Sequence, residues 1–173
     1  MIITALLLIL TLGAPQQAPQ KTTIPGGMNV TRVDATVMCG GATTDEAFPA
    51  LKKEGFVSVL NLRQADEPGV DLQASRAAAQ SVGLRYVHIP VRGAGPDPSS
   101  VDAFLTAVQD RSNQPMYIHC GTANRVGALW LVKRVLVDGW DVPRATEEAN
   151  AIGLTSENLR KFALDYVATH QKK

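Results

Sequence analysis

Short apolar, β-branched segments alternate with helical patterns along most of this chain, and this alternation is the strongest constraint on its fold. Residues 56–62 read FVSVLNL, a continuous apolar run typical of a strand that is covered on both faces. Further strands are predicted over residues 30–39, 84–89 and 116–119. The alternating order of strands and helices predicts an α/β fold, with a mostly parallel sheet and helices on both faces.

Helical patterns fill the segments between the predicted strands. Residues 101–108 carry apolar side chains at helical spacing, after Asp97 at an N-cap position and Pro98 at the first helical position. Thr43 and Glu46 have the spacing of a capping box, and Pro49 predicts a loose first turn in the helix that follows. Other helices are predicted over residues 71–82, 125–137, 143–151 and 155–170. A chain of 173 residues accommodates this pattern as a single domain.

The N-terminal segment does not fit the predicted domain. Residues 2–12 read IITALLLILTL, which is too short to cross a bilayer but has the length of the apolar region of a secretory signal. The polar, proline-containing stretch that follows cannot continue a core element. We therefore expect residues 1–20 to be a signal peptide and linker and residues 21–173 to form the domain. The protein is expected to be exported, periplasmic or secreted, with no stable membrane insertion.

Charge and cysteine content exclude several function classes. Lys and Arg number 17 against 16 Asp and Glu, and aromatic residues make up 5% of the chain, so no basic surface with stacking rings is predicted to bind nucleic acid. Cys39 and Cys120 are too few for a disulfide framework, and no cluster has zinc-ligand spacing. We expect no metal and no cofactor. Cys39 is expected in the core, with a protective disulfide to Cys120 as the alternative.

One segment combines residues that carry chemistry. Residues 118–127 read IHCGTANRVG and lie between a predicted strand and a helix N-terminus, where free N–H groups and the helix dipole favour an anion. A thiolate at Cys120 is such an anion, and Arg125 can hold two oxygens of a phosphate. The segment predicts a nucleophile and an oxyanion site, with a buried structural thiol as the alternative. The residues predicted to bind substrate are Gly121, Thr122, Ala123 and Asn124.

This segment resembles the signature of the cysteine-dependent tyrosine and dual-specificity phosphatases. More narrowly, the chain is similar to the bacterial phosphatase-like family known as beta-lactamase-hydrolase-like or DUF442. The similarity rests on GGAT at residues 40–43, VLNLR at 59–63, GLRY at 83–86, IPV at 89–91 and HCGTANRVGALW at 119–130. It implies a cysteine phosphatase fold and hydrolysis of a phosphomonoester, including phosphotyrosine, through a phosphocysteine. The implied partner is a phosphorylated small molecule or protein.

The segment also departs from the superfamily signature. Four residues rather than five separate Cys120 from Arg125. Ala123 stands where a glycine is usual, and Val126 replaces a hydroxyl residue that helps the thiolate leave. A four-residue spacing is also similar to rhodanese loops. Two alternatives therefore stay open: a sulfurtransferase that carries a persulfide, and a non-catalytic pseudophosphatase that binds anions.

Five other residues are candidates for supporting roles. The resemblance implies that His119 orients the loop through hydrogen bonds, with a plain strand histidine as the alternative. Asp97 lies where the superfamily has its general acid, although it also suits the cap of the following helix. Asp66 and Glu67 are alternative acids. Arg63 adds positive charge for substrate binding or pairs with Glu67.

Overall fold

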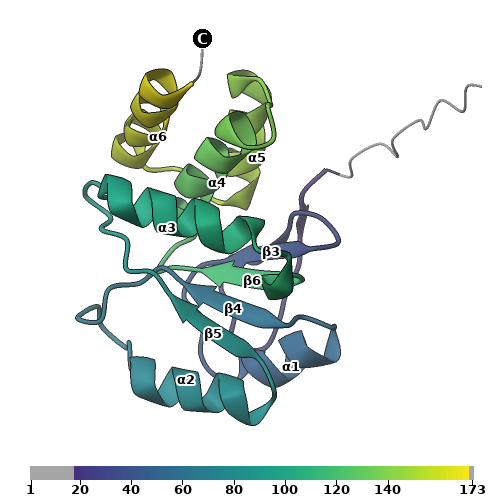
Figure 1. The fold of residues 1–173 in the computed structure, drawn as a ribbon. Coiled ribbons are helices and arrows are strands. Elements are labelled where there is room, and N and C mark those ends of the chain that lie inside the picture. Colours follow the sequence, from purple (N-terminus) through teal and green to yellow (C-terminus); the bar gives the residue numbers. More distant parts are fainter. Residues whose placement is uncertain (1–17, 172–173) are drawn as a thin grey trace, which may run out of the picture.

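Six strands form one mixed sheet in the order β1-β2-β3-β6-β4-β5 in the computed structural model, which describes residues 18–171 (Figure 1). The neighbours β3–β6, β6–β4 and β4–β5 run parallel, whereas β1–β2 and β2–β3 are antiparallel. The predicted mostly parallel α/β sheet is therefore confirmed. The strands are β1 (Gln20–Lys21), β2 (Thr31–Arg32), β3 (Val37–Gly40), β4 (Ser58–Asn61), β5 (Arg85–His88) and β6 (Met116–His119).

Helices cover both faces of the sheet (Figure 1). Successive residues of a strand point to opposite faces, so Tyr117 of β6 joins the core beneath α1 and α2, and Ile118 joins the core beneath the other helices. Helices α5 and α6 pack against α4. The helices are α1 (Ala47–Lys53), α2 (Leu72–Ser81), α3 (Pro98–Gln109), α4 (Asn124–Leu136), α5 (Val142–Ile152) and α6 (Glu157–His170), with a 3₁₀ turn at Arg111–Asn113.

Helix α1 differs from its prediction. It begins at Ala47 rather than near residue 43, and its N-cap residue Glu46 makes no side-chain cap hydrogen bond. The predicted capping box is wrong because the Thr43 hydroxyl is used elsewhere: it lies 2.8 Å from the Tyr117 hydroxyl and donates to the Gly41 carbonyl at 3.1 Å. Pro49 is accommodated in the first turn, where backbone N–H groups have no partner within the helix.

The predicted signal sequence falls almost entirely within residues 1–17, which lie outside the described residues. Between residues 18 and 171, no helix is long and apolar enough to cross a membrane. The other predicted helices are observed within a few residues of their expected limits. In particular, Pro98 begins α3 directly after Asp97, and α4 begins at Asn124.

Candidate functional site

Cys120 directly follows β6, and Arg125 is the second residue of α4. We call residues 120–125 the cysteine loop. Hydrogen bonds fasten this loop to both neighbouring strand ends: the Ala42 amide donates to the Gly121 carbonyl at 2.9 Å, and the Leu62 amide donates to the His119 carbonyl at 2.9 Å. Because β3, β6 and β4 are parallel, their carboxyl ends meet here, the edge at which open α/β sheets bind ligands.

Hydrogen bonds to protein acceptors hold Arg125 through the two terminal nitrogens of its guanidinium group. Nη1 donates to the carbonyls of Val91 at 2.9 Å and Leu62 at 3.3 Å and to Oε1 of Glu67, while Nη2 donates to Oε2 of Glu67 at 2.8 Å. No carboxylate or carbonyl of the described residues accepts a hydrogen bond from Nε. The Cys120 side chain also forms a hydrogen bond with the Arg125 guanidinium. The edge formed by Nε and Nη2, which no carboxylate or carbonyl other than Glu67 occupies, can donate two hydrogen bonds to an oxyanion.

The pairing of Arg125 with Glu67 fixes both charges. Burial alone would raise the pKa of Glu67, but hydrogen bonds from Arg125, the Gln64 amide and Arg63 lower it to about 2. Burial alone would lower the pKa of Arg125, but the Glu67 hydrogen bonds and the nearby Cys120 raise it. Glu67 is thus a carboxylate and Arg125 a guanidinium throughout the ordinary pH range. The sequence offered a pair with Glu67 as the alternative to a substrate-binding role for Arg63; that pair is present at 3.1 Å, and the contact of Glu67 with Arg125 was not predicted.

The loop itself is tightly built. Ala123 is completely buried and has φ +74°, as expected if it replaces a glycine, and this left-handed conformation strains a residue with a Cβ. Its Cβ would lie 2.9 Å from a Cβ added at Gly153, which itself has φ +140°. A Cβ at Gly121 would lie 3.2 Å from Arg125 Nη2. Glycine at positions 121 and 153 therefore permits the close packing of the loop.

Asn124 joins the cysteine loop to the segment between α5 and α6. Its Oδ1 accepts hydrogen bonds from the backbone amides of Thr155 and Ser156, both at 2.7 Å, and its Nδ2 donates to Oγ1 of Thr122 at 3.1 Å. The sequence assigned Asn124 to substrate binding. In the structure both ends of its side-chain amide bind protein partners, which positions the loop, and its contact with substrate stays a prediction.

His119 is buried beneath the loop and stacks on Tyr117, with ring centroids 5.8 Å apart. Neither ring nitrogen has a hydrogen-bond partner among the described residues, so the predicted orientation of the loop through those hydrogen bonds is not seen. Burial, together with the charges of Arg63 and Arg125, lowers the pKa of His119 to about 3, although the Cys120 backbone opposes the shift. The imidazole is therefore neutral at physiological pH.

Cys120 itself is fully buried, and two cavities lie near the carboxyl ends of the parallel strands, of which only one, which we call the α6 cavity, is lined by residues of the cysteine loop. The α6 cavity has a volume of about 410 Å³ and is lined by Arg125, Glu67, Thr122 and Asn124, with Gly93 and Ser156. The α2 cavity, also of about 410 Å³, is lined by Arg63, Met28 and residues of the segments that begin α1 and α2. Arg63 thus lines one cavity, Arg125 lines the other, and Glu67 joins the two arginines.

The predicted acids occupy different environments. Asp97 caps α3 by position, but its side chain makes no cap hydrogen bond. Instead, Oδ1 lies 2.6 Å from Nη2 of Arg92, and both side chains are half exposed. Asp66 is exposed. The loop that ends at Asp97 approaches the site through the Val91 carbonyl, which binds Arg125, and through Gly93 in the wall of the α6 cavity.

Cys39 and Cys120 are both free thiols. Cys39 lies on β3 opposite Ile118 and is completely buried, as expected for a core cysteine. Burial, with the charges of Glu148 and Asp34, raises the pKa of Cys39 well above its usual value. Cys39 is therefore a protonated, unreactive thiol, and the predicted alternative of a disulfide with Cys120 is not formed in this structure.

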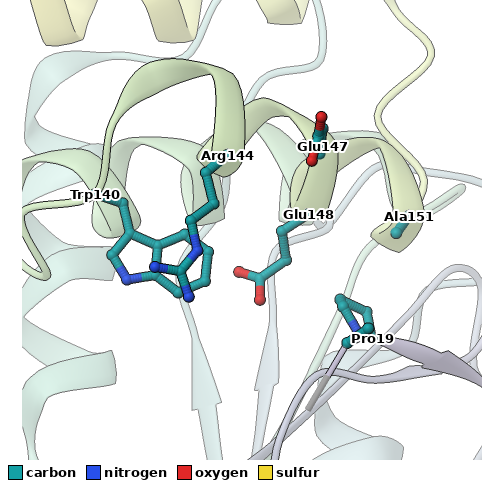
Figure 2. A pocket seen from close by; sticks show the side chains of 7 residues that line it. Pro19, Trp140, Arg144, Glu147, Glu148 and Ala151 are labelled. Atoms are coloured by element: carbon teal, nitrogen blue, oxygen red, sulfur yellow. The ribbon is translucent and has the colours of Figure 1, made fainter. Parts of the chain in front are cut away.

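A further cavity of about 370 Å³ lies at the other end of α4 (Figure 2). Figure 2 shows Arg144 against Trp140, where the guanidinium carbon lies 3.6 Å from the ring centroid, with the Glu148 carboxylate beside them. Glu148 accepts hydrogen bonds from Arg134 and from Trp130 Nε1, the latter at 2.7 Å. This cavity borders a network of ion pairs around Glu148 and is lined by no residue of the cysteine loop. Throughout residues 18–171, no group of three or more His, Cys, Asp or Glu could hold a metal ion.

Comparison with known sequences identifies related phosphatases. The sequence profile of the family described as DSP-PTPase phosphatase fused to NAD+ kinase matches residues 16–164. The Beta-lactamase hydrolase-like protein of Agrobacterium fabrum is 28% identical over 114 residues, which cover 63% of this chain and 26% of that protein. The dual specificity protein phosphatase TpbA of Pseudomonas aeruginosa is 23% identical over 156 residues, 89% of this chain and 68% of that protein. The chain thus spans about a quarter of the first relative and about two thirds of the second.

Solved structures share this fold. The DUF442 protein of Shewanella putrefaciens superimposes with a TM-score of 0.70 at 19% identity, over 86% of this chain and 94% of the other. The complex of P. aeruginosa TpbA with phosphotyrosine superimposes with a TM-score of 0.65 at 21% identity, over 90% of both chains. These similarities confirm the predicted cysteine phosphatase fold.

Proposed function

We propose that this chain, which belongs to the family described as DSP-PTPase phosphatase fused to NAD+ kinase, hydrolyses a phosphomonoester with Cys120 as its nucleophile. The observation that carries the proposal is the placement of Arg125. Glu67 binds both terminal nitrogens of the guanidinium, so the Nε edge can bind an oxyanion. Arg125 lies at the end of the loop that begins with Cys120, in the first turn of α4. Donors fixed in advance stabilise the charge that develops in a transition state.

The proposed reaction has two steps. In the first, the Cys120 thiolate attacks phosphorus, an S–P bond forms and the ester P–O bond breaks, while an acid protonates the leaving oxygen. Arg125 and the backbone amides of the loop hold the phosphoryl oxygens. In the second, water attacks phosphorus and gives its proton to the carboxylate that the acid became in the first step, the S–P bond breaks, and phosphate and the thiolate are released. Val126 supplies no hydroxyl to help the thiolate leave, so we expect the second step to be the slower one.

We propose Asp97 as the acid, with Asp66 as the alternative. Glu67 is unsuited to this role because its pKa of about 2 keeps it deprotonated while it binds two arginines. Asp97 lies at the end of a loop whose first residues contact Arg125 and line the α6 cavity. A movement of this loop that breaks the exposed pair with Arg92 would bring Asp97 toward the leaving group.

The proposed substrates are aryl phosphates such as phosphotyrosine. Support comes from the related P. aeruginosa phosphatase, which was crystallised with phosphotyrosine. In the same proposal, the backbone amides of Gly121 and Thr122 donate hydrogen bonds to the phosphoryl oxygens of the substrate.

The test is an assay of p-nitrophenyl phosphate and thiosulfate side by side. Wild-type protein should hydrolyse the ester, Cys120→Ser should abolish turnover, and Cys39→Ala should retain it as the control cysteine. Consumption of thiosulfate without ester hydrolysis would favour the sulfurtransferase. Oxyanion binding without either reaction would favour the pseudophosphatase.

We also propose that the protein is exported and loses about its first twenty residues, on the basis of the apolar run at residues 2–12. Mass spectrometry of protein from cell fractions tests this. The expected result is a shortened chain outside the cytoplasm, and an intact Met1 on cytoplasmic protein would contradict it.

A further inference from the structure

The charge balance around the cysteine loop is unfavourable for a substrate with several anionic groups. Among the residues that line the α2 and α6 cavities, the cations are Arg63 and Arg125. Both bind the single carboxylate of Glu67. Arg63 also donates to the Pro68 carbonyl at 2.6 Å. One phosphate can bind the Nε edge of Arg125, but the described cavity walls hold only two arginines against the three carboxylates of Asp45, Glu67 and Asp71, so a second anionic group meets no net positive charge.

The α2 cavity is instead rich in hydrogen-bond acceptors. Asp45 and Asp71 both line it. Oδ1 of Asp45 accepts from the Ser75 hydroxyl at 2.8 Å, and Oδ1 of Asp71 accepts from the Ala74 amide at 2.9 Å. The Oδ2 atoms accept no hydrogen bond from the described residues. Each carboxylate therefore keeps an oxygen that can accept a hydrogen bond from a bound molecule.

The α2 cavity also has an apolar wall, and hydrogen bonds link that wall to the cysteine loop. The side chain of Met28 is 64% exposed at its wall, and Pro68 also lines it. The Met28 amide donates to the Ala42 carbonyl at 3.0 Å, and the Ala42 amide donates to Gly121 of the cysteine loop at 2.9 Å. The cavity wall and the loop are thus joined through one residue. Arg63 in the wall of this cavity and Arg125 also bind the same Glu67 carboxylate, which places the cavity beside the site of Arg125.

We propose that the α2 cavity receives the part of the leaving group that is remote from the scissile oxygen, and selects a part that donates hydrogen bonds or carries positive charge over one that carries further carboxylate or phosphate groups. This inference rests on the proposed function, because it assumes that the phosphate of the substrate binds at the cysteine loop. Met28 and Pro68 contact the apolar part of the leaving group, while Asp45 and Asp71 accept its donors. Polyphosphorylated compounds are disfavoured because each additional phosphate meets cavity walls in which carboxylates outnumber arginines.

Two compounds that differ only at a remote substituent test this preference. Phosphotyramine carries an ammonium group on a two-carbon arm, and 3-(4-hydroxyphenyl)propanoate phosphate carries a carboxylate on an arm of similar length. Dissociation constants are measured with Cys120→Ser, which does not turn over, and kcat/KM is measured with the active protein. We expect phosphotyramine to bind about tenfold more tightly, the size of one partly solvated charge interaction.

Matched variants assign the preference to the cavity. Asp45→Asn with Asp71→Asn removes both charges while keeping the Oδ1 acceptors, and should reduce the ratio of the two dissociation constants to about twofold or less. Asp141→Asn with Asp165→Asn is the control, because it also removes two charges, one of them from a helix N-cap, away from the cavity. The control should keep the tenfold ratio.

The outcomes separate the two proposals. Equal binding of both compounds, tighter binding of the carboxylate compound, or binding of neither would overturn the cavity assignment. A ratio that persists in Asp45→Asn with Asp71→Asn would overturn it as well. If wild-type protein hydrolyses neither compound while Cys120→Ser still shows the binding preference, the proposed function is contradicted and the cavity assignment stands.

Discussion

The carboxylate of Glu67 binds both terminal nitrogens of the Arg125 guanidinium, and the same carboxylate accepts a hydrogen bond from Arg63 Nε at 3.1 Å. Glu67 lies in the loop that follows β4, whereas Arg125 lies 58 residues further along the chain on α4. Their contact fixes the orientation of the guanidinium relative to the cysteine loop. It also leaves the Nε edge as the part of Arg125 that can bind a ligand.

Glu67→Gln should reduce catalysis without removing a group that contacts substrate. A glutamine amide keeps one acceptor but turns an NH₂ group toward the guanidinium, so one hydrogen bond is lost and Arg125 is less well oriented. We expect kcat/KM for p-nitrophenyl phosphate to fall about 10-fold to 100-fold, the size of effect that small misplacements produce. Glu46→Gln, an exposed position before α1, is the control. Unchanged kinetics in Glu67→Gln would contradict the role of the pair.

The same pair predicts a pH dependence of stability. Because hydrogen bonds lower the pKa of Glu67 from 4.5 to about 2, its stabilising contribution is complete above about 4.5 and is lost as the pH falls toward 2. Wild-type protein should therefore be more stable than Glu67→Gln near neutral pH. The difference in their free energies of unfolding should shrink as the pH falls from about 4.5 to about 2. Urea unfolding at several pH values measures it. A difference that stays constant or grows in acid would argue against the pairing.

Gly153→Ala should destabilise the protein more than Gly139→Ala. Both glycines have positive φ, but a Cβ at Gly139 meets nothing within 4 Å, whereas one at Gly153 lies 2.6 Å from Asn29 Nδ2 and 2.9 Å from the Ala123 Cβ. We expect backbone strain alone to lower the free energy of unfolding by about 1 kcal/mol in Gly139→Ala. Crowding against the cysteine loop should raise the loss to about 2–4 kcal/mol for Gly153→Ala. Equal unfolding midpoints would show that the loop does not pack tightly on Gly153.

Asp97→Asn tests the assignment of the general acid. Poor leaving groups need protonation and good ones do not, so the variant should slow phenyl phosphate hydrolysis far more than p-nitrophenyl phosphate hydrolysis. Stability should change little because the pair with Arg92 is exposed. Asp66→Asn is compared in the same assay. Equal losses for both esters in Asp97→Asn, with a selective loss in Asp66→Asn, would transfer the role to Asp66.

The sequence was informative where local signals were strong. The apolar run before His119 and the nearly all-apolar segment after Arg125 correctly placed a strand, a turn and a buried helix around Cys120. The Asp97–Pro98 pair correctly located the start of α3. The resemblance also placed Ala123 where a glycine is usual, and Ala123 has φ +74°, a conformation that favours glycine. These features depend on residues that are close together in the chain.

Contacts between distant segments were harder to predict. The capping box at Thr43 failed because Tyr117 on β6 takes up the hydroxyl, a partner 74 residues away. The contact of Glu67 with Arg125 depends on β4 lying beside β6, which strand order along the chain does not reveal. Knowledge of that adjacency would have indicated the pair, because the loop after β4 then ends beside the start of α4. The sequence likewise did not indicate the protein partners of the Asn124 side chain, which belong to the segment that precedes α6.

The most direct test of the account is the detection of a phosphoryl group on Cys120 during turnover. Wild-type protein is mixed with excess p-nitrophenyl phosphate, quenched in acid within the first turnovers, digested and analysed by mass spectrometry. We predict that the peptide containing Cys120 gains the mass of one phosphoryl group, that the peptide containing Cys39 does not, and that Cys120→Ser shows no adduct and no turnover. Turnover that persists in Cys120→Ser, or that proceeds in wild-type protein with no adduct at any quench time, would contradict Cys120 as the nucleophile.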